Sequence, residues 1–123
     1  MAKAETTIVL VHGAWADGSS WNRIIPLLQA KGHRVIAVQV PLTSLEDDLA
    51  ATKRIIADTG GAIVLVGHSW GGMTVTQAGD DPRVVALVYV SAFAPDAGAI
   101  DVRGFPVNTE VKDPYTGKIF LVP

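Results

Sequence analysis

The stretch Ile63–Thr74, which reads Ile-Val-Leu-Val-Gly-His-Ser-Trp-Gly-Gly-Met-Thr, decides how the rest of the chain is interpreted. An apolar, β-branched run stops at Gly67, a G-x-S-x-G pattern follows, and a helix-like segment comes next. A strand-turn-helix of this kind presents its central serine on a tight bend, where a side chain on either flanking glycine would collide with neighbouring backbone. Ser69 is therefore a candidate nucleophile. The alternative interpretation is a glycine-rich turn that holds a surface serine.

The composition is that of a single globular domain. The chain has 123 residues, of which 49% are hydrophobic and 18% charged, enough to bury a core. Its net charge is -2 and no Lys/Arg stripe occurs, so we expect neither nucleic acid nor an anionic membrane as a partner. The absence of cysteine excludes disulfides and a thiolate metal site. The polar start, Met1–Glu5, and the lack of long apolar runs predict a cytoplasmic protein with no membrane segment.

Expected strands and helices alternate along the first 90 residues. The expected strands are Thr6–Val11, Arg34–Val40, Ile63–Val66 and Val84–Val90. The expected helices are Trp21–Lys31, a second one between the capping box Thr43-x-x-Glu46 and Thr59-Gly60-Gly61, and Gly71–Ala78. This alternation predicts an α/β fold, with a parallel sheet of about four strands and helices on both faces. We expect residues 1–123 to form one domain with its core at about 6–95; the tail, 96–123, is a loop, a cap-like excursion or a hairpin.

Two details of the helices can be predicted. Within the first helix, Gly32 is the expected stop, and the apolar stripe is Ile24, Ile25, Leu27 and Leu28. Pro26 lies too deep to be a first-position proline, which predicts a bend or an irregular turn there. Acidic side chains favour the first turn of a helix, so the structural interpretation applies to Glu46, Asp47 and Asp48.

Two segments together carry a family resemblance: Val-His-Gly-Ala-Trp at residues 11–15 and Gly-His-Ser-Trp-Gly-Gly at residues 67–72. They resemble the α/β-hydrolase fold superfamily, and within it the small esterases grouped with plant-type methylesterases and hydroxynitrile lyases. The resemblance runs from about Thr6 to Pro95 and covers only the N-terminal half of that fold. It implies a sheet in which the second strand lies outside the first, followed by the third and the fourth.

The resemblance also implies an activity. It makes the chain a serine hydrolase, a carboxylesterase for small-molecule esters that needs no cofactor. In that reaction Ser69 attacks the ester carbonyl, and the peptide N–H groups of Ala14 and Trp70 form the oxyanion hole. The residues around them are the candidate pocket: His12, Gly13, Trp15 and His68. Trp15 and Trp70 either line an acyl pocket or pack in the core.

The chain departs from the family in its histidines. Family members are longer, and their triad runs serine, acid, histidine, with the last two on late loops. Here the three histidines are His12, His33 and His68. The resemblance implies a structural hydrogen-bonding role for His12, with a base acting on Ser69 as the alternative. We expect His68 to pack beside the sheet and His33 to be solvated.

The acids do not complete a triad either. Asp96 and Asp101 follow the fourth expected strand, where some relatives place the triad acid, but without a histidine to orient they read as loop carboxylates. Three separated histidines and no paired acidic motif leave a metal site unsupported. Full activity therefore needs a base from a further segment or a partner chain. The alternative is a truncated, catalytically impaired domain that keeps the fold but lacks the triad acid and histidine.

A truncated sheet predicts an association. The strand Val84–Val90 would be an apolar edge, and such an edge readily joins another chain. We therefore expect a homodimer in which two copies pair antiparallel through this strand.

Overall fold

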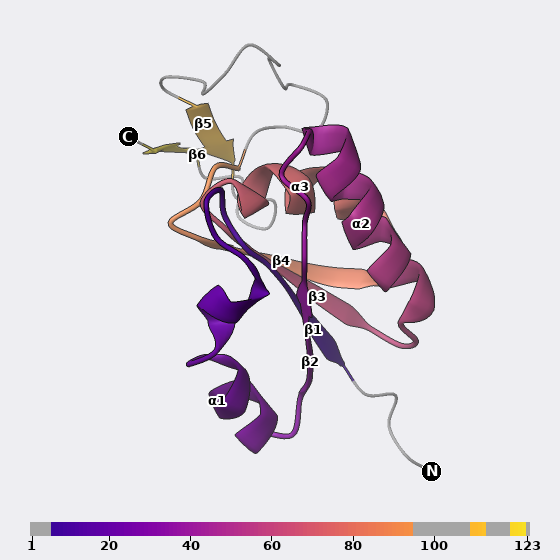
Figure 1. Ribbon diagram of the computed structural model, residues 1–123. Helices are drawn as coiled ribbons and strands as arrows, with labels where there is room; N and C mark the ends of the chain where they lie inside the picture. Colours follow the sequence, from indigo (N-terminus) through magenta and orange to yellow (C-terminus); the bar gives the residue numbers. More distant parts are fainter. Residues whose placement is uncertain (1–5, 95–108, 113–118, 123) are drawn as a thin grey trace.

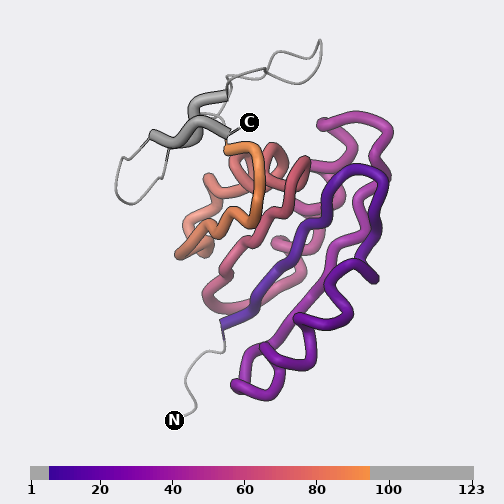
Figure 2. Tube along the Cα trace, turned by 90° about the vertical axis from the view of Figure 1, so that its left-hand side faces the viewer, coloured from indigo at the N-terminus to yellow at the C-terminus, as the bar shows by residue number. Residues whose placement is uncertain are grey.

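A four-stranded parallel sheet runs through the computed structural model, which describes residues 6–94, 109–112 and 119–122 (Figure 1). Its strands are β1 (Thr7–Val11), β2 (Arg34–Val38), β3 (Ile63–His68) and β4 (Val84–Val90). They lie in the order β2-β1-β3-β4, and every neighbouring pair is parallel. Figure 2 shows them side by side, from β4 in orange to β2 in purple. This order, with β2 outside β1, is the one that the sequence predicted.

Helices cover both faces of the sheet (Figure 1). The 3₁₀ helix η1 (Gly18–Trp21) and α1 (Ile25–Ala30) lie on one face, and α2 (Leu45–Asp58) and α3 (Gly71–Ala78) lie on the other. Successive strand side chains point to opposite faces, and the two halves of the core follow that alternation. Ile8, Leu10 and Val66 pack with Trp21 on the α1 face, whereas Val9, Val11, Ile63, Leu65, Ile56 and Val75 form the core of the α2–α3 face. The predicted α/β fold class is confirmed.

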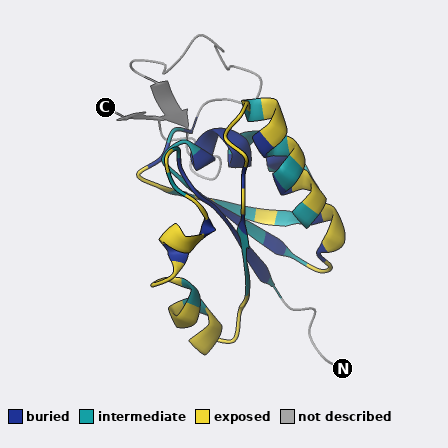
Figure 3. Ribbon diagram, in the orientation of Figure 1, coloured by how far each residue is buried: buried dark blue, intermediate teal, exposed yellow. Residues whose placement is uncertain are grey.

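Burial is highest along the two central strands (Figure 3). All five residues of β1 are buried, which is why its sequence is continuously apolar rather than alternating. A separate antiparallel pair consists of β5 (Thr109–Lys112) and β6 (Ile119–Val122). The remainder of the predicted tail lies outside the described residues. No helix in the described part of the chain is long and apolar enough to cross a membrane.

The first helix differs from the prediction. The expected helix Trp21–Lys31 is a 3₁₀ turn followed by a helix that starts only at Ile25. Pro26 therefore sits in the first helical turn, where its missing N–H has no helical partner to lose. The predicted apolar stripe is also only half correct, because Ile24 is 41% and Leu27 63% exposed, whereas Ile25 and Leu28 pack against the core. Gly32 ends the helix as predicted, with a φ of +87°.

The cap of α2 differs by one residue. The expected capping box began at Thr43, but the N-cap is Ser44, whose hydroxyl accepts a hydrogen bond from the peptide N–H of Asp47 at 3.0 Å. Thr43 instead donates its hydroxyl to the Asp47 carboxylate at 2.5 Å. Ser44 has the extended backbone that a cap requires, so the helix begins at Leu45. It ends before Thr59, as expected.

Candidate active site

Ser69 occupies a strained bend between β3 and α3. Its φ is +52°, a left-handed conformation that non-glycine residues adopt at a cost of on the order of 1 kcal/mol or more. Its peptide N–H donates to the Val90 carbonyl at 3.3 Å, which ties the bend to the end of β4. The bend thus lies at the carboxyl edge of the parallel sheet, half-buried and directly before the N-cap of α3.

Three glycines make this bend possible. An added Cβ at Gly67 would lie 2.7 Å from the carbonyl oxygen of Gly71, and one at Gly71 would lie 2.3 Å from that of Val11. At Gly72 the added atom would be only 1.8 Å from the Phe93 carbonyl oxygen. The obstacles are backbone atoms, which cannot swing aside as a flexible side chain can. The predicted collision at the two motif glycines is therefore present, and Gly72 adds a third.

The loop after β1 lies against the serine. An ideal Cβ placed on Gly13 would be 3.0 Å from the Ser69 Cβ, so this loop and the bend are in van der Waals contact. Because Ala14 directly follows Gly13, its peptide N–H lies near the bend that holds Ser69. The structure thus brings together two segments that are more than 50 residues apart in the sequence.

The orientation of the peptide that joins Ser69 to Trp70 is fixed from its carbonyl side. The Ser69 carbonyl accepts hydrogen bonds from the N–H groups of Gly72 at 3.1 Å and Phe93 at 3.2 Å. In a trans peptide the N–H points opposite to the carbonyl, so the Trp70 N–H is directed away from these two donors. Among the described residues, the hydrogen bonds of the fold engage neither this N–H nor that of Ala14. Both groups remain available as donors.

His12 is fully buried and both of its ring nitrogens have partners. The Val40 peptide N–H donates to Nε2 at 3.1 Å, and Nδ1 lies 2.8 Å from the Gly13 carbonyl oxygen. Since Nε2 accepts, we assign the proton to Nδ1, which donates to that carbonyl. This arrangement joins the β1 loop to the end of β2 and leaves no ring nitrogen for Ser69.

The other two histidines lie in different surroundings. His68 places its ring edge-on against Trp21, with ring centroids 6.2 Å apart and planes at 80°, on the α1 face of the sheet. His33 is exposed and directly precedes β2. It therefore lies at the amino edge of the sheet, a strand length away from Ser69 at the carboxyl edge. Asp96 and Asp101 lie outside the described residues.

The two candidate pocket tryptophans have different environments. Trp15 is 92% exposed, with a φ of +56°, so the core-packing alternative is wrong for it. Trp70 is half-buried, and its indole Nε1 donates to the Asp48 carboxylate at 3.1 Å. The sequence predicts only a first-turn acid at Asp48, yet this residue is fully buried. Its spacing of four and eight residues from Thr52 and Ile56, which are also buried, is the signal that would have revealed it.

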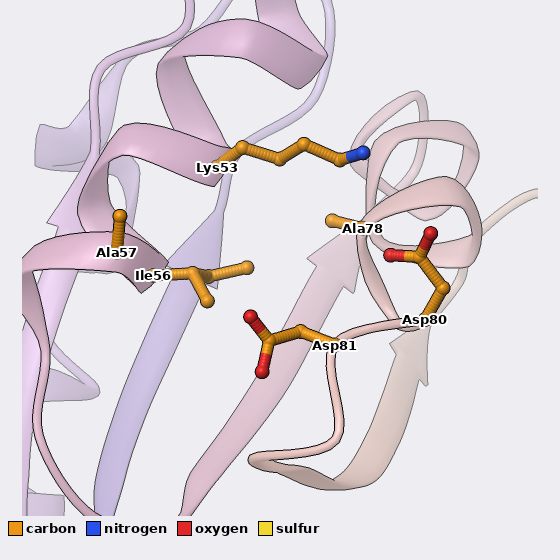
Figure 4. Close-up of a pocket in the computed structure, with 6 residues that line it drawn as sticks. All are labelled: Lys53, Ile56, Ala57, Ala78, Asp80 and Asp81. Carbon is orange, nitrogen blue, oxygen red and sulfur yellow. The ribbon is translucent and has the colours of Figure 1, made fainter.

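A cavity of about 280 Å³ lies away from this site, between α2 and the turn that follows α3 (Figure 4). The residues that line it are Lys53, Ile56, Ala57, Ala78, Asp80 and Asp81. Hydrogen bonds from Arg83, which also ion-pairs with Asp81 at 3.1 Å, hold the pKa of that carboxyl below its usual 3.8. The turn precedes β4, so the cavity is at the amino edge. No cluster of metal-binding side chains occurs among the described residues.

Sequence comparisons connect this arrangement to known proteins. The model of the alpha/beta hydrolase family matches residues 8–118. Salicylic acid-binding protein 2 of Nicotiana tabacum is 34% identical over an alignment of 112 residues, which covers 72% of this chain and 40% of that protein. Carbendazim hydrolyzing esterase of Nocardioides sp. is 35% identical over 104 residues, covering 73% of this chain and 43% of the esterase. Methylesterases and an alpha-hydroxynitrile lyase of Arabidopsis thaliana are also relatives.

The structural comparison agrees. Crystalline polyneuridine aldehyde esterase superimposes with a TM-score of 0.67 at 28% identity, over 75% of this chain and 42% of the esterase. The chain spans about two fifths of the length of the relatives that it matches. The family match over most of the sequence, with the sheet order and the serine bend, shows that this chain belongs to the alpha/beta hydrolase family.

Proposed function

We propose that this chain carries the nucleophile and the oxyanion hole of a serine carboxylesterase that acts on small-molecule esters. The observation that carries the proposal is the positive φ of Ser69 on a bend whose glycines admit no side chain. Backbone strain of this kind clusters at functional sites, and nucleophiles at strand-helix bends adopt it. Relatives that are named as esterases support the same chemistry.

In the proposed reaction, the Ser69 hydroxyl oxygen attacks the ester carbonyl carbon and passes its proton to a base. The N–H groups of Ala14 and Trp70 donate to the oxyanion of the tetrahedral intermediate. The carbonyl re-forms as the alcohol leaves with a proton, and the acyl group remains on Ser69. Water then attacks the acyl-enzyme, which releases the acid and returns the proton to the serine.

We infer that the base comes from outside the described residues. Both ring nitrogens of His12 are engaged, His68 packs on Trp21, and His33 lies at the opposite edge. This observation favours the second candidate function, an impaired domain that keeps the fold and the bend without efficient turnover. In a serine protease, removal of the base lowers kcat by roughly a millionfold.

A fluorophosphonate probe separates the two candidates. The probe phosphonylates an activated serine, whose oxygen displaces fluoride from phosphorus, and intact mass shows the adduct on the folded protein. The variants are Ser69→Ala and, as a matched control, Ser91→Ala, since Ser91 also has a positive φ after a strand. We expect one adduct that disappears in Ser69→Ala and persists in Ser91→Ala. If the folded wild-type protein gains no adduct, the esterase proposal fails and the impaired-domain candidate takes its place.

We also propose that the chain forms a homodimer in which exposed apolar side chains of β4 pack against the same strand of a second copy. Val88 and Val90 are each 41% exposed. They lie on the same face of the sheet as α1, which covers the other strands and leaves β4 uncovered. Light scattering after gel filtration tests this: Val88→Lys should give a monomer, and Leu27→Lys, on exposed α1, should leave the dimer intact. A wild-type monomer at high concentration would refute the dimer.

A further inference from the structure

Asp48 is a charged residue in a place where charge is costly. It lies on α2 with an exposed fraction of 0%, on the side of the helix that faces α3 and the serine bend. Burying a carboxylate is unfavourable unless hydrogen bonds replace its water. An apolar residue on this stripe would stabilise the helix packing without that cost. A specific use of the carboxylate would explain why an acid is present.

Both carboxylate oxygens are used, and they connect three segments. Oδ1 accepts from the Leu42 peptide N–H at 2.8 Å, and Oδ2 accepts from the Trp70 indole Nε1 at 3.1 Å. Leu42 lies in the β2–α2 loop and has a φ of +60°. Asp48 thus joins that loop, the body of α2 and the residue that follows Ser69. Hydrogen bonds to an ionised acceptor are about twice as strong as neutral ones.

Trp70 supplies two groups with different partners. Its indole is held by Asp48, and its peptide N–H is the proposed oxyanion donor beside Ser69. The Ser69 carbonyl fixes one end of this peptide through Gly72 and Phe93, and the indole bond fixes the side chain at the other end. With both ends held, the N–H is preorganised toward the oxyanion, which is what makes such donors effective.

We propose that Asp48 is a positioning residue that sets the reactivity of Ser69 by anchoring the Trp70 indole. This inference rests on the proposed esterase function for its chemical readout, but the anchoring itself is testable without turnover. Loss of the anchor frees the indole and lets the backbone at Trp70 fluctuate more, so its peptide N–H spends less time in the orientation that meets the oxyanion. The effect should reach Ser69 although Asp48 touches no reacting atom.

The variants are Asp48→Asn, Trp70→Phe and the double variant, with Asp47→Asn as the matched control. Asp47 is the neighbouring acid on the same turn, but it is exposed and bonds only near the cap. An asparagine oxygen can accept from only one of the two donors, and phenylalanine keeps the aromatic ring without the N–H. Each single variant leaves one buried group without its partner, which can impair folding. The double variant removes both partners of the bond, so it provides a folded comparison in that case.

The chemical readout is the second-order rate of fluorophosphonate labelling. We expect a fall of about tenfold in Asp48→Asn and in Trp70→Phe, no further fall in the double variant, and less than about twofold change in Asp47→Asn. Non-additivity shows that the two residues act through one bond. Unchanged labelling in folded Asp48→Asn or Trp70→Phe would overturn the proposal and leave the esterase function standing.

The structural readout is the NMR signal of Trp70. The chain has three tryptophans, and the indole N–H signal that is missing in Trp70→Phe identifies this residue. In Asp48→Asn that signal should move, and hydrogen exchange of the Trp70 indole N–H, which donates to Asp48 in the wild-type protein, should rise about tenfold, with little change in Asp47→Asn. If Asp48→Asn shows these changes but the wild-type protein takes no label, the esterase function fails and the anchoring holds. An unmoved signal and unchanged exchange would refute the anchoring.

Discussion

Replacement of Gly71 by alanine tests the packing on which the serine bend depends. The new methyl group would lie 2.3 Å from the Val11 carbonyl oxygen and 3.0 Å from that of His12, whereas ordinary contact begins at 3.4 Å. The first overlap therefore exceeds 1 Å, and both obstacles are main-chain atoms at the end of a fully buried strand. Overpacking typically costs about 1–3 kcal/mol. Since β1 cannot yield here, we expect about 3 kcal/mol or more.

The assay is chemical and thermal unfolding followed by circular dichroism. For a domain of this size, about 3 kcal/mol corresponds to a fall in Tm of about 12 °C. Gly60→Ala is the matched control, because nothing lies within 4 Å of a Cβ at Gly60; its free energy of unfolding should change by less than about 1 kcal/mol. If Gly71→Ala melts within about 2 °C of the wild-type protein, α3 does not approach β1 as closely as the structure shows.

Three further predictions concern the supporting fold. Gly32→Ala should lower the free energy of unfolding, measured in urea, by about 1 kcal/mol. Its φ of +87° is the sole cause, since nothing lies within 4 Å of the added Cβ. His12→Phe should cost about 3 kcal/mol, because two buried hydrogen bonds are lost, whereas His33→Phe at an exposed site should change stability by less than about 0.5 kcal/mol. Because Arg83 lowers the pKa of Asp81 below 3.8, the ion pair stabilises the fold above that pH and the contribution is lost as pH falls through the folded pKa. As pH falls through this range, the free energy of unfolding should therefore decrease less steeply in Asp81→Asn than in the wild-type protein. Parallel decreases in the two proteins would contradict the role of this ion pair.

The strands and the bend could be predicted because local rules govern them. Ile63–Thr74 combines a buried-strand composition with glycines at positions where backbone meets backbone, and the structure places the same residues in β3, the bend and α3. The limits of α3 and β4 agree with the prediction to the residue. Here each residue's own preference and the tertiary environment point the same way.

The errors arise where neighbours compete. Thr43 and Ser44 are adjacent hydroxyl residues that can both cap, and the sequence pattern favoured the one with Glu46 three residues later. In the structure Ser44 is the residue with the extended backbone of a cap, and its hydroxyl accepts from the peptide N–H of Asp47. Asp48 was missed for a related reason: its partners, Leu42 and Trp70, are known only when the chain is folded. Pattern rules treat an acid on an apolar stripe as a surface residue.

Backbone strain is distributed unequally between the two edges of the sheet. In the described part of the chain, every non-glycine residue with a positive φ follows a strand, at the carboxyl edge; these residues are Trp15, Leu42, Ser69 and Ser91. The two positive-φ glycines, Gly32 and Gly61, precede β2 and β3 at the amino edge. Glycine adopts this conformation without steric cost, whereas each other residue contributes on the order of 1 kcal/mol of strain.

The amino edge of the sheet therefore avoids backbone strain, whereas the carboxyl edge retains it. Glycine at the four carboxyl-edge positions would relieve on the order of 4 kcal/mol of strain, a large part of the 5–15 kcal/mol that typically separates folded from unfolded domains. Ligands of open α/β sheets bind at this same edge. Two of the strained positions are held by the fold around them: Ser69 by the N–H groups of Gly72 and Phe93, and Leu42 by Asp48. The strain persists because these contacts over-determine the backbone, and it lies where Ser69 has to present its hydroxyl.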